Sequence, residues 1–392
     1  MSEQIITQRK MSYVWIYMFA FCALGALLPL IGQYLSFIGF SGTQIGTITS
    51  AGTATAIFAS TFWGKLYNKR KNKKSFVCKL IIAAALVCVF LSFIENYFLF
   101  LMVFCVLYFF QAPSMALIDA ITIEDRQSFG AARKWGSIGF AIGVFITGQI
   151  AELFGLTMIF WIYIVSFTVV ALIIFVMSRA KSDKPIIHDE AAEKVTEKSS
   201  AVFYKNKKYI LLVISAFFLY GTIVANNTYF GFLFIEGGGT LAGIGVAFLL
   251  MAGSEAPFMA WAGKLSERFT TEKLLLVAFC LSALRFAWYA TCPPAGLLLG
   301  FFVLQGMTTG IIIVEFVKYV AKIVKEDELG FAISVYYALG TGVSGIFYLM
   351  LSGVILDHYD IGMVYAFFAC MNLLGVVVYV AGRLHKSSRV IK

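Results

Sequence analysis

The stretch Gly64-Lys65-Leu66-Tyr67-Asn68-Lys69 recurs 199 residues later as Gly263-Lys264-Leu265-Ser266-Glu267-Arg268. Each copy closes the second long apolar stretch of its half of the chain and leads into a basic segment before the third. A chain that repeats itself at this distance within apolar segments is typical of a duplicated membrane domain.

The composition independently indicates a membrane protein. Hydrophobic residues make up 60% of the 392 residues and charged residues only 13%, against about 25% charged in ordinary soluble domains. The formal net charge of +10 would also suit a nucleic-acid-binding protein, but the basic residues follow a membrane pattern. We therefore expect a polytopic membrane protein and no nucleic-acid partner.

Twelve apolar stretches are each long enough to cross a bilayer as a helix. Six of them precede one long polar stretch and six follow it. We predict an all-α integral membrane fold of two pseudo-symmetric six-helix halves, residues 1–178 and 209–392, joined by a cytoplasmic linker, 179–208. The predicted spans are 12–35, 44–66, 76–94, 97–122, 131–151, 156–178, 209–234, 241–263, 273–291, 295–319, 330–352 and 361–382.

The basic residues lie on one side of this predicted topology. The N-terminus, the C-terminus and the even-numbered loops with the span ends next to them hold 30 of the 31 Lys and Arg residues, and the other one, Arg285, lies deep inside the ninth span. By the positive-inside rule, both termini and the linker are predicted to face the cytoplasm. The chain is thus expected to be a multi-pass protein of the cytoplasmic membrane.

Arg285 is the clearest case of a charge predicted to lie deep in the membrane. A charge at the bilayer centre costs at least about 2.5 kcal/mol, so it needs a partner or a role. It can bind a polar or anionic substrate in a cavity, or modulate a coupling acid, or form a permanent ion pair that holds helices together. We favour a functional role because intramembrane charges are functional by default, and we expect Glu255, in the eighth span, to be its partner.

The repeat and several local motifs resemble the major facilitator superfamily over essentially the whole chain. The Gly64 copy is similar to the loop signature of that family, with Asn68 where an acidic residue usually stands. Further segments resemble the branch that holds lactose permease and the phenylpropionate permeases: Ala26-x-x-Pro29, Gln44-Ile45-Gly46, 129–136, Glu255-Ala256-Pro257-Phe258 and Lys318-Tyr319.

The resemblance implies a transporter whose two halves enclose a substrate site. It implies that Arg133, at the start of the fifth span, and Glu255 hold the substrate. Taken alone, Arg133 is equally well explained as one more cytoplasmic basic residue, and Glu255 as a neutral, hydrogen-bonded acid. Glu255 is also the best candidate for a proton carrier, because all three histidines lie outside the predicted spans.

The other candidates are polar or aromatic residues within the spans. Asn226 and Asn227 are adjacent amides midway through the seventh span, which need buried partners; they bind substrate or form interhelical hydrogen bonds. Gln305 and Phe140 complete the set of substrate-binding candidates. Glu315 and Lys318 are three residues apart and are predicted to pair on one helix face.

The two basic hairpins are predicted to form the cytoplasmic gate. Its candidate residues are Gly64, Asn68, Lys69, Asp119, Gly263, Glu267 and Arg268. Asp119 lies late in the fourth span, where we expect it to pair with basic residues of the loops.

The sequence also departs from lactose permease at functional positions. Gln305 and Thr308 stand in place of its span-ten His and Glu, Phe140 in place of its span-five Trp, and Met115 in place of its span-four Glu. The chain is therefore not expected to be a galactoside permease.

We predict a secondary active transporter for a small organic solute, namely a sugar, nucleoside or aromatic acid, that works by alternating access and proton symport. A drug or metabolite exporter driven by proton antiport is the nearest alternative, and a receptor or scaffold that transports nothing is a third. We expect no enzymatic activity, no cofactor and no metal. The expected partners are the substrate, protons and membrane lipid, and we expect a monomer.

Overall fold

The computed structural model describes residues 3–179, 206–325 and 328–386, and within these ranges it contains helices and no strand. The elements are α1 (Glu3–Leu27), α2 (Ile31–Phe37), α3 (Gly42–Asn68), α4 (Lys73–Leu91), α5 (Tyr97–Glu124), α6 (Phe129–Phe154), α7 (Met158–Arg179), α8 (Lys207–Glu236), α9 (Leu241–Phe269), α10 (Thr271–Tyr289), α11 (Ala295–Ile323), α12 (Leu329–Tyr337), a π-helical segment (Ala338–Val343), α13 (Ser344–His358) and α14 (Ile361–Ala381).

These elements form the twelve predicted spans, two of which are interrupted. The first span is broken between α1 and α2 at Pro29, whose ring has no N–H to donate and disturbs the preceding turn. The eleventh span runs from α12 through the π-helical segment into α13. Both stretches, Met11–Phe37 and Leu329–His358, are nevertheless long and apolar enough to cross a membrane, as predicted for 12–35 and 330–352.

Ten spans are long and apolar enough to cross a membrane by length and composition alone. The two described helices that fall outside this group are α3 and α10. The sequence of α3 is rich in Gly, Thr and Ser, and α10 carries Glu272, Lys273 and Arg285 within its 19 residues. Both helices are therefore less apolar than their neighbours, although each occupies the place of one span in the twelve-helix fold.

Contacts between residues divide the chain into two compact units. The N-terminal unit comprises Met1–Ile186 with Thr240–Ala252, and the C-terminal unit comprises Ile187–Gly239 with Gly253–Lys392. The predicted division into 1–178, 179–208 and 209–392 stays a prediction, because residues 180–205 of the linker lie outside the described residues.

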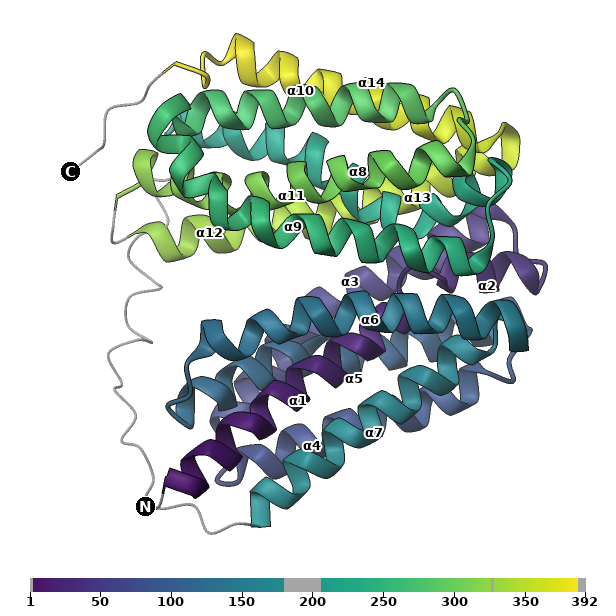
Figure 1. The fold of residues 1–392 in the computed structure, drawn as a ribbon, viewed down its shortest axis with the longest axis vertical. Helices are drawn as coiled ribbons and strands as arrows, with labels where there is room; N and C mark the ends of the chain where they lie inside the picture. Colours follow the sequence, from purple (N-terminus) through teal and green to yellow (C-terminus); the bar gives the residue numbers. More distant parts are fainter. Residues whose placement is uncertain (1–2, 180–205, 326–327, 387–392) are drawn as a thin grey trace. The chain divides into compact units, whose positions relative to one another are not determined.

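In the N-terminal unit, α1 packs along α6, α3 along α5, and α4 along α7 (Figure 1). Glycines bring the backbones of α1 and α6 into direct contact. A Cβ atom at Gly139 would overlap the backbone of Met18, and one at Gly143 would overlap the backbone of Cys22. Small residues of this kind allow close helix packing in membranes, where the hydrophobic effect does not drive helices together.

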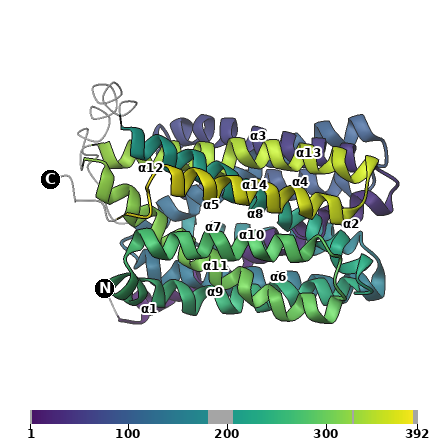
Figure 2. The ribbon, with the colours of Figure 1, turned by 90° about the horizontal axis from the view of Figure 1, so that it is seen from above.

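In the C-terminal unit, α8 packs against α13 and α14, as Figure 2 also shows, and α10 packs against α11 and α14. Buried tyrosines add bonds to backbone carbonyl groups of neighbouring helices. Tyr209 Oη donates to the Ala332 carbonyl oxygen at 2.8 Å, and Tyr229 Oη donates to that of Leu349 at 2.9 Å. These bonds join α8 to α12 and α13 near both ends of the eleventh span.

The helix α9 lies less closely against α11 than α3 lies against α5. The backbone of Glu255 approaches Gly310, and Ser254 Oγ donates to the Val303 carbonyl oxygen at 3.0 Å. Beside these contacts, an apolar cavity of about 450 Å³ lies between Phe258 of α9 and residues 296–307 of α11. The segment of α9 around Glu255 is thus held by few contacts within this unit.

The close packing of α1 on α6 predicts a clear difference between two glycines of α6. Gly139→Ala should destabilise the protein by about 1–3 kcal/mol, because the added methyl group overpacks a backbone contact. Gly130→Ala is the matched control, since nothing lies within 4 Å of a Cβ atom at Gly130. Thermal unfolding of the purified variants in detergent measures both; equal melting temperatures for the two variants would contradict the packing described.

Candidate functional site

A buried polar cluster joins four helices of the C-terminal unit. Gln305 Oε1, on α11, accepts hydrogen bonds from Arg285 Nη1 on α10 and from Asn226 Nδ2 on α8, the latter at 3.0 Å. Tyr365 Oη, on α14, donates to Asn226 Oδ1 at 2.9 Å. Each of these four side chains is at most 2% exposed, so the cluster replaces water as the hydrogen-bonding environment of Arg285.

Arg285 has no acidic partner among the residues that the structure describes. Its guanidinium carbon lies 4.4 Å from the ring centroid of Phe286 and 5.5 Å from that of Tyr289. Its Nε atom is buried and has no hydrogen-bond partner in the described part of the chain. The cluster therefore holds a positive charge that the Gln305 amide oxygen and two aromatic rings stabilise, and its Nε–H group has no acceptor in the described part of the chain.

The expected pairing of Arg285 with Glu255 is not present. Glu255 is half-buried on α9 and lies close enough to Tyr220 of α8 for its charge to act on the phenol. Tyr220 packs edge-on against Tyr336 at a centroid distance of 5.6 Å. The sequence argument failed here because opposite charges looked like natural partners, whereas the helices bring a neutral amide, Gln305, to the guanidinium.

Asn227 points away from the cluster that its neighbour Asn226 joins. Successive residues of a helix point about 100° apart, so the two amides serve different faces of α8. Asn227 is half-buried, and its Oδ1 atom is buried without a hydrogen-bond partner among the described residues. It is thus a second buried acceptor that the C-terminal unit leaves available.

In the N-terminal unit, Arg133 and Asp119 meet at Tyr17. The Arg133 guanidinium lies 4.3 Å from the ring centroid of Phe21 and 5.9 Å from that of Tyr17, both on α1. Tyr17 Oη donates to Asp119 Oδ1 at 2.7 Å. Asp119 therefore lies beside Arg133 and hydrogen-bonds a tyrosine, whereas the sequence led us to expect a basic loop residue as its partner.

Phe140 contributes to the same unit mainly through its backbone. Its carbonyl group lies against Gly25 of α1, and its side chain is half-buried on α6.

Two ion pairs tie the loop ends of α4 and α5 together. Lys73 Nζ lies 2.6 Å from Glu124 Oε1, and Lys74 Nζ lies 2.6 Å from Asp125 Oδ2. Tyr13 Oη, on α1, donates to Asp125 at 2.7 Å. The basic segment after the first repeat copy is thereby joined to the end of α5.

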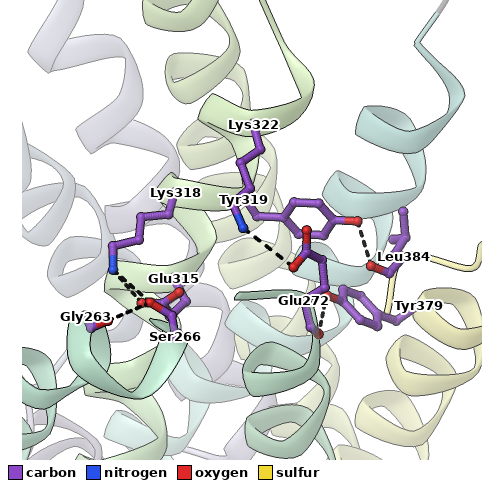
Figure 3. A network of polar contacts seen from close by, with 9 residues as sticks. All are labelled: Gly263, Ser266, Glu272, Glu315, Lys318, Tyr319, Lys322, Tyr379 and Leu384. Atoms are coloured by element: carbon purple, nitrogen blue, oxygen red, sulfur yellow. Dashed lines mark hydrogen bonds and ion pairs between the residues drawn. The ribbon is translucent and has the colours of Figure 1, made fainter. Parts of the chain in front are cut away.

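The second repeat copy makes a different set of contacts (Figure 3). Lys318 Nζ lies 2.8 Å from Glu315 Oε1 and 3.3 Å from Ser266 Oγ, which donates to the Gly263 carbonyl oxygen. This confirms the predicted pairing of Glu315 with Lys318. It also shows that Ser266 of the repeat contacts α11 through Lys318.

A third contact in Figure 3 mirrors the Lys73–Glu124 pair with the charges exchanged. Glu272, at the start of α10, stands 199 residues after Lys73, and its carboxylate lies 3.6 Å from Lys322 near the end of α11. Each unit thus has an ion pair between the same two helix ends, but the acidic and basic partners are exchanged between the units.

The remaining gate candidates make no side-chain bond to other described residues. Four of their side chains are exposed and form no ion pair in the described ranges: Asn68, Lys69, Glu267 and Arg268. Gly64 has open space around it, and Gly263 lies beneath the Lys318 ammonium group. Their role as gate residues stays a prediction.

Tyrosines are the residues that the sequence argument missed. Tyr13 and Tyr17 stand four residues apart on α1 and donate to Asp125, directly after α5, and to Asp119 within α5. Their spacing was a readable signal, because residues at i and i+4 share a helix face. Tyr365 carried no such signal, since its partner lies 139 residues away.

Within the described residues, no group of three or more His, Cys, Asp or Glu side chains is arranged to hold a metal ion.

Comparison with known proteins assigns this arrangement to a family. Residues 10–367 match the model of the MFS_1 like family. The chain is 32% identical to the maltose permease of Geobacillus stearothermophilus, over 94% of this chain and 93% of that one. It is 29% identical to the sucrose permease of Escherichia coli over 28% of this chain and 29% of that one.

A solved structure confirms the architecture. The nucleoside transporter NupG superimposes with a TM-score of 0.81 at 18% identity, covering 95% of this chain and 98% of that one. At this identity the likeness shows the twelve-helix fold alone.

The shared acceptor at Gln305 predicts a strong dependence of Arg285 on this residue. Gln305→Met should cost about 2–5 kcal/mol, because it leaves the guanidinium and the Asn226 amide without their acceptor. The double variant Arg285→Met with Gln305→Met should be more stable than Gln305→Met alone, because it also removes the buried charge. Thermal unfolding in detergent measures the stability of each variant. If the double variant loses as much stability as the two single variants together, the coupling between Arg285 and Gln305 is contradicted.

Proposed function

Because the chain belongs to the MFS_1 like family of membrane transporters and is not an enzyme, we propose that it is a secondary active transporter for a sugar. The observation that carries this proposal is the similarity to a maltose permease along nearly the whole length of both chains. A disaccharide of the maltose type is therefore the first substrate to test, ahead of a nucleoside or an aromatic acid.

We propose that the C-terminal unit binds this substrate through its polar cluster and the acceptor beside it. Arg285 Nε and Asn227 Oδ1 are a buried donor and a buried acceptor without partners among the described residues. Sugar hydroxyl groups both donate and accept hydrogen bonds, so they match this combination. Gln305 and Asn226 hold Arg285 in place for that role.

The N-terminal unit is proposed to contribute Arg133 to substrate binding. Phe21 and Tyr17 flank its guanidinium, which orients the planar group and leaves its N–H donors for a ligand. Phe140, near the middle of the same helix, is proposed as an apolar contact for a sugar ring. Asp119 and Tyr17 fix the position of α5 beside Arg133.

Proton coupling through Glu255 is the finer part of the proposal. No ion pair holds this carboxyl in the described residues, and α9 has few contacts with α11 around it. A carboxyl group in such a place can gain or lose a proton as the helix moves. Alternating access would then link the protonation of Glu255 to the occupancy of the substrate site.

The topology proposed for this transporter has both termini and the linker in the cytoplasm. Its support is the one-sided placement of basic residues. The ion pairs at the loop ends of α4 and α5, and of α10 and α11, are proposed to keep each helix pair rigid while the cytoplasmic gate opens and closes.

Uptake into proteoliposomes under an imposed proton gradient tests both parts of this proposal. The wild type should accumulate labelled maltose when protons flow inward. Glu255→Gln should lose this accumulation but retain exchange of internal for external maltose, because the substrate site is intact. Glu95→Gln, which changes an exposed carboxyl group at a loop, should behave as the wild type.

Two outcomes would contradict the proposal. Gradient-driven accumulation by Glu255→Gln would remove Glu255 as the proton carrier. Maltose efflux driven by an inward proton gradient in the wild type would replace symport with the exporter alternative.

A further inference from the structure

The two hairpins that contain the repeat differ greatly in charge. We define the first hairpin as residues 64–79 and the second as the equivalent residues 263–278. The first contains seven basic residues and no acidic one, whereas the second contains three basic and two acidic residues. The two hairpins join equivalent helices of their units, and the positive-inside rule predicts Lys or Arg in each of them. Three basic residues satisfy this rule in the second hairpin, whereas the first hairpin holds seven.

Internal ion pairs neutralise only part of that excess. Lys73 and Lys74 are paired with Glu124 and Asp125. The other five basic side chains are exposed and form no ion pair within the described ranges: Lys65, Lys69, Arg70, Lys71 and Lys79. The Arg70 guanidinium lies 5.5 Å from the Phe76 ring centroid, which holds it at the start of α4. The structure thus concentrates uncompensated positive charge on one short connection.

The position of the first hairpin identifies the ligand chemistry. It joins two membrane-spanning helices, so its side chains lie at the level of the lipid headgroups. Basic clusters immediately outside a spanning helix attract anionic lipids, and the attraction grows with each added Lys or Arg. Exposed ammonium and guanidinium groups are also the natural donors to phosphate oxygens.

We propose that the first hairpin is a binding site for the phosphodiester headgroups of anionic phospholipids. Lys65, Arg70 and Lys71 bind the headgroups. The ion pairs of Lys73 and Lys74 to α5 fix the hairpin, so the lipid is held next to the end of the N-terminal helix pair. The second hairpin, with its near-neutral charge, has no such site.

Native mass spectrometry of the purified full-length protein tests this site with phosphatidylglycerol and phosphatidylcholine as probes. The wild type should retain phosphatidylglycerol in preference to phosphatidylcholine. The triple variant Lys65→Gln, Arg70→Gln and Lys71→Gln should lose this preference by about tenfold or more. The matched control, Lys264→Gln, Lys273→Gln and Lys325→Gln, removes three exposed charges from the C-terminal unit and should keep the preference.

A charge-preserving variant separates the loss of positive charge from a folding defect caused by three substitutions. Lys65→Arg, Arg70→Lys and Lys71→Arg should retain phosphatidylglycerol as the wild type does, because the charge is unchanged. Equal loss in the first triple variant and in the control would overturn the proposal in favour of general electrostatic attraction. Displacement of the bound lipid by millimolar inorganic phosphate would also overturn it, because the site would then select a free anion.

Discussion

The side-chain amide oxygen of Gln305, Oε1, is the acceptor on which the polar interior of the C-terminal unit depends. It binds Arg285 and Asn226 at once, and Tyr365 extends the same chain of hydrogen bonds to α14. In an apolar interior an unpaired guanidinium is costly, so the four helices must keep the register that brings these groups together. The Nε atom of Arg285 has no hydrogen-bond partner in the described residues, and this free donor is the reason for proposing a substrate site at the cluster.

The two copies of the internal repeat share their helix packing but differ in the charges at their helix ends. Most equivalent helices pack in the same pattern, with α1, α6 and α7 corresponding to α8, α13 and α14, although α9 lies less closely on α11 than α3 does on α5. The helix ends beside the repeat are joined by ion pairs of reversed polarity, Lys73 with Glu124 and Lys322 with Glu272. The hairpins beside these pairs also differ in charge, with seven basic residues in the first, and three basic and two acidic residues in the second.

The fold was largely predictable from the sequence, whereas the partners within the site were not. Apolar length and basic-residue placement locate all twelve spans, because the bilayer imposes both patterns on each segment locally. Local spacing also predicted the Glu315–Lys318 pair. The break at Pro29 and the π-helical segment near Gly340 were missed, since hydropathy does not report how a helix is interrupted.

The partner of Arg285 required knowledge of which helices meet. Gln305 lies 20 residues from it and Tyr365 lies 139 residues from Asn226, and no periodicity relates such positions. Charge complementarity favoured Glu255 at the sequence level, yet a neutral amide satisfies a guanidinium as an acceptor without a second buried charge. The candidates Arg285, Asn226 and Gln305 were named from the sequence; that they form one cluster is a structural finding.

Equilibrium binding of maltose to purified protein tests the proposed role of the cluster most directly. The wild type should bind maltose, and the double variant Arg285→Met with Gln305→Met should bind it at least about tenfold more weakly while melting as a folded protein. The loss is expected because the variant keeps the helices packed but removes the charged donor and the amide that positions it. Wild-type affinity in the folded double variant would contradict the assignment of the substrate site to this cluster.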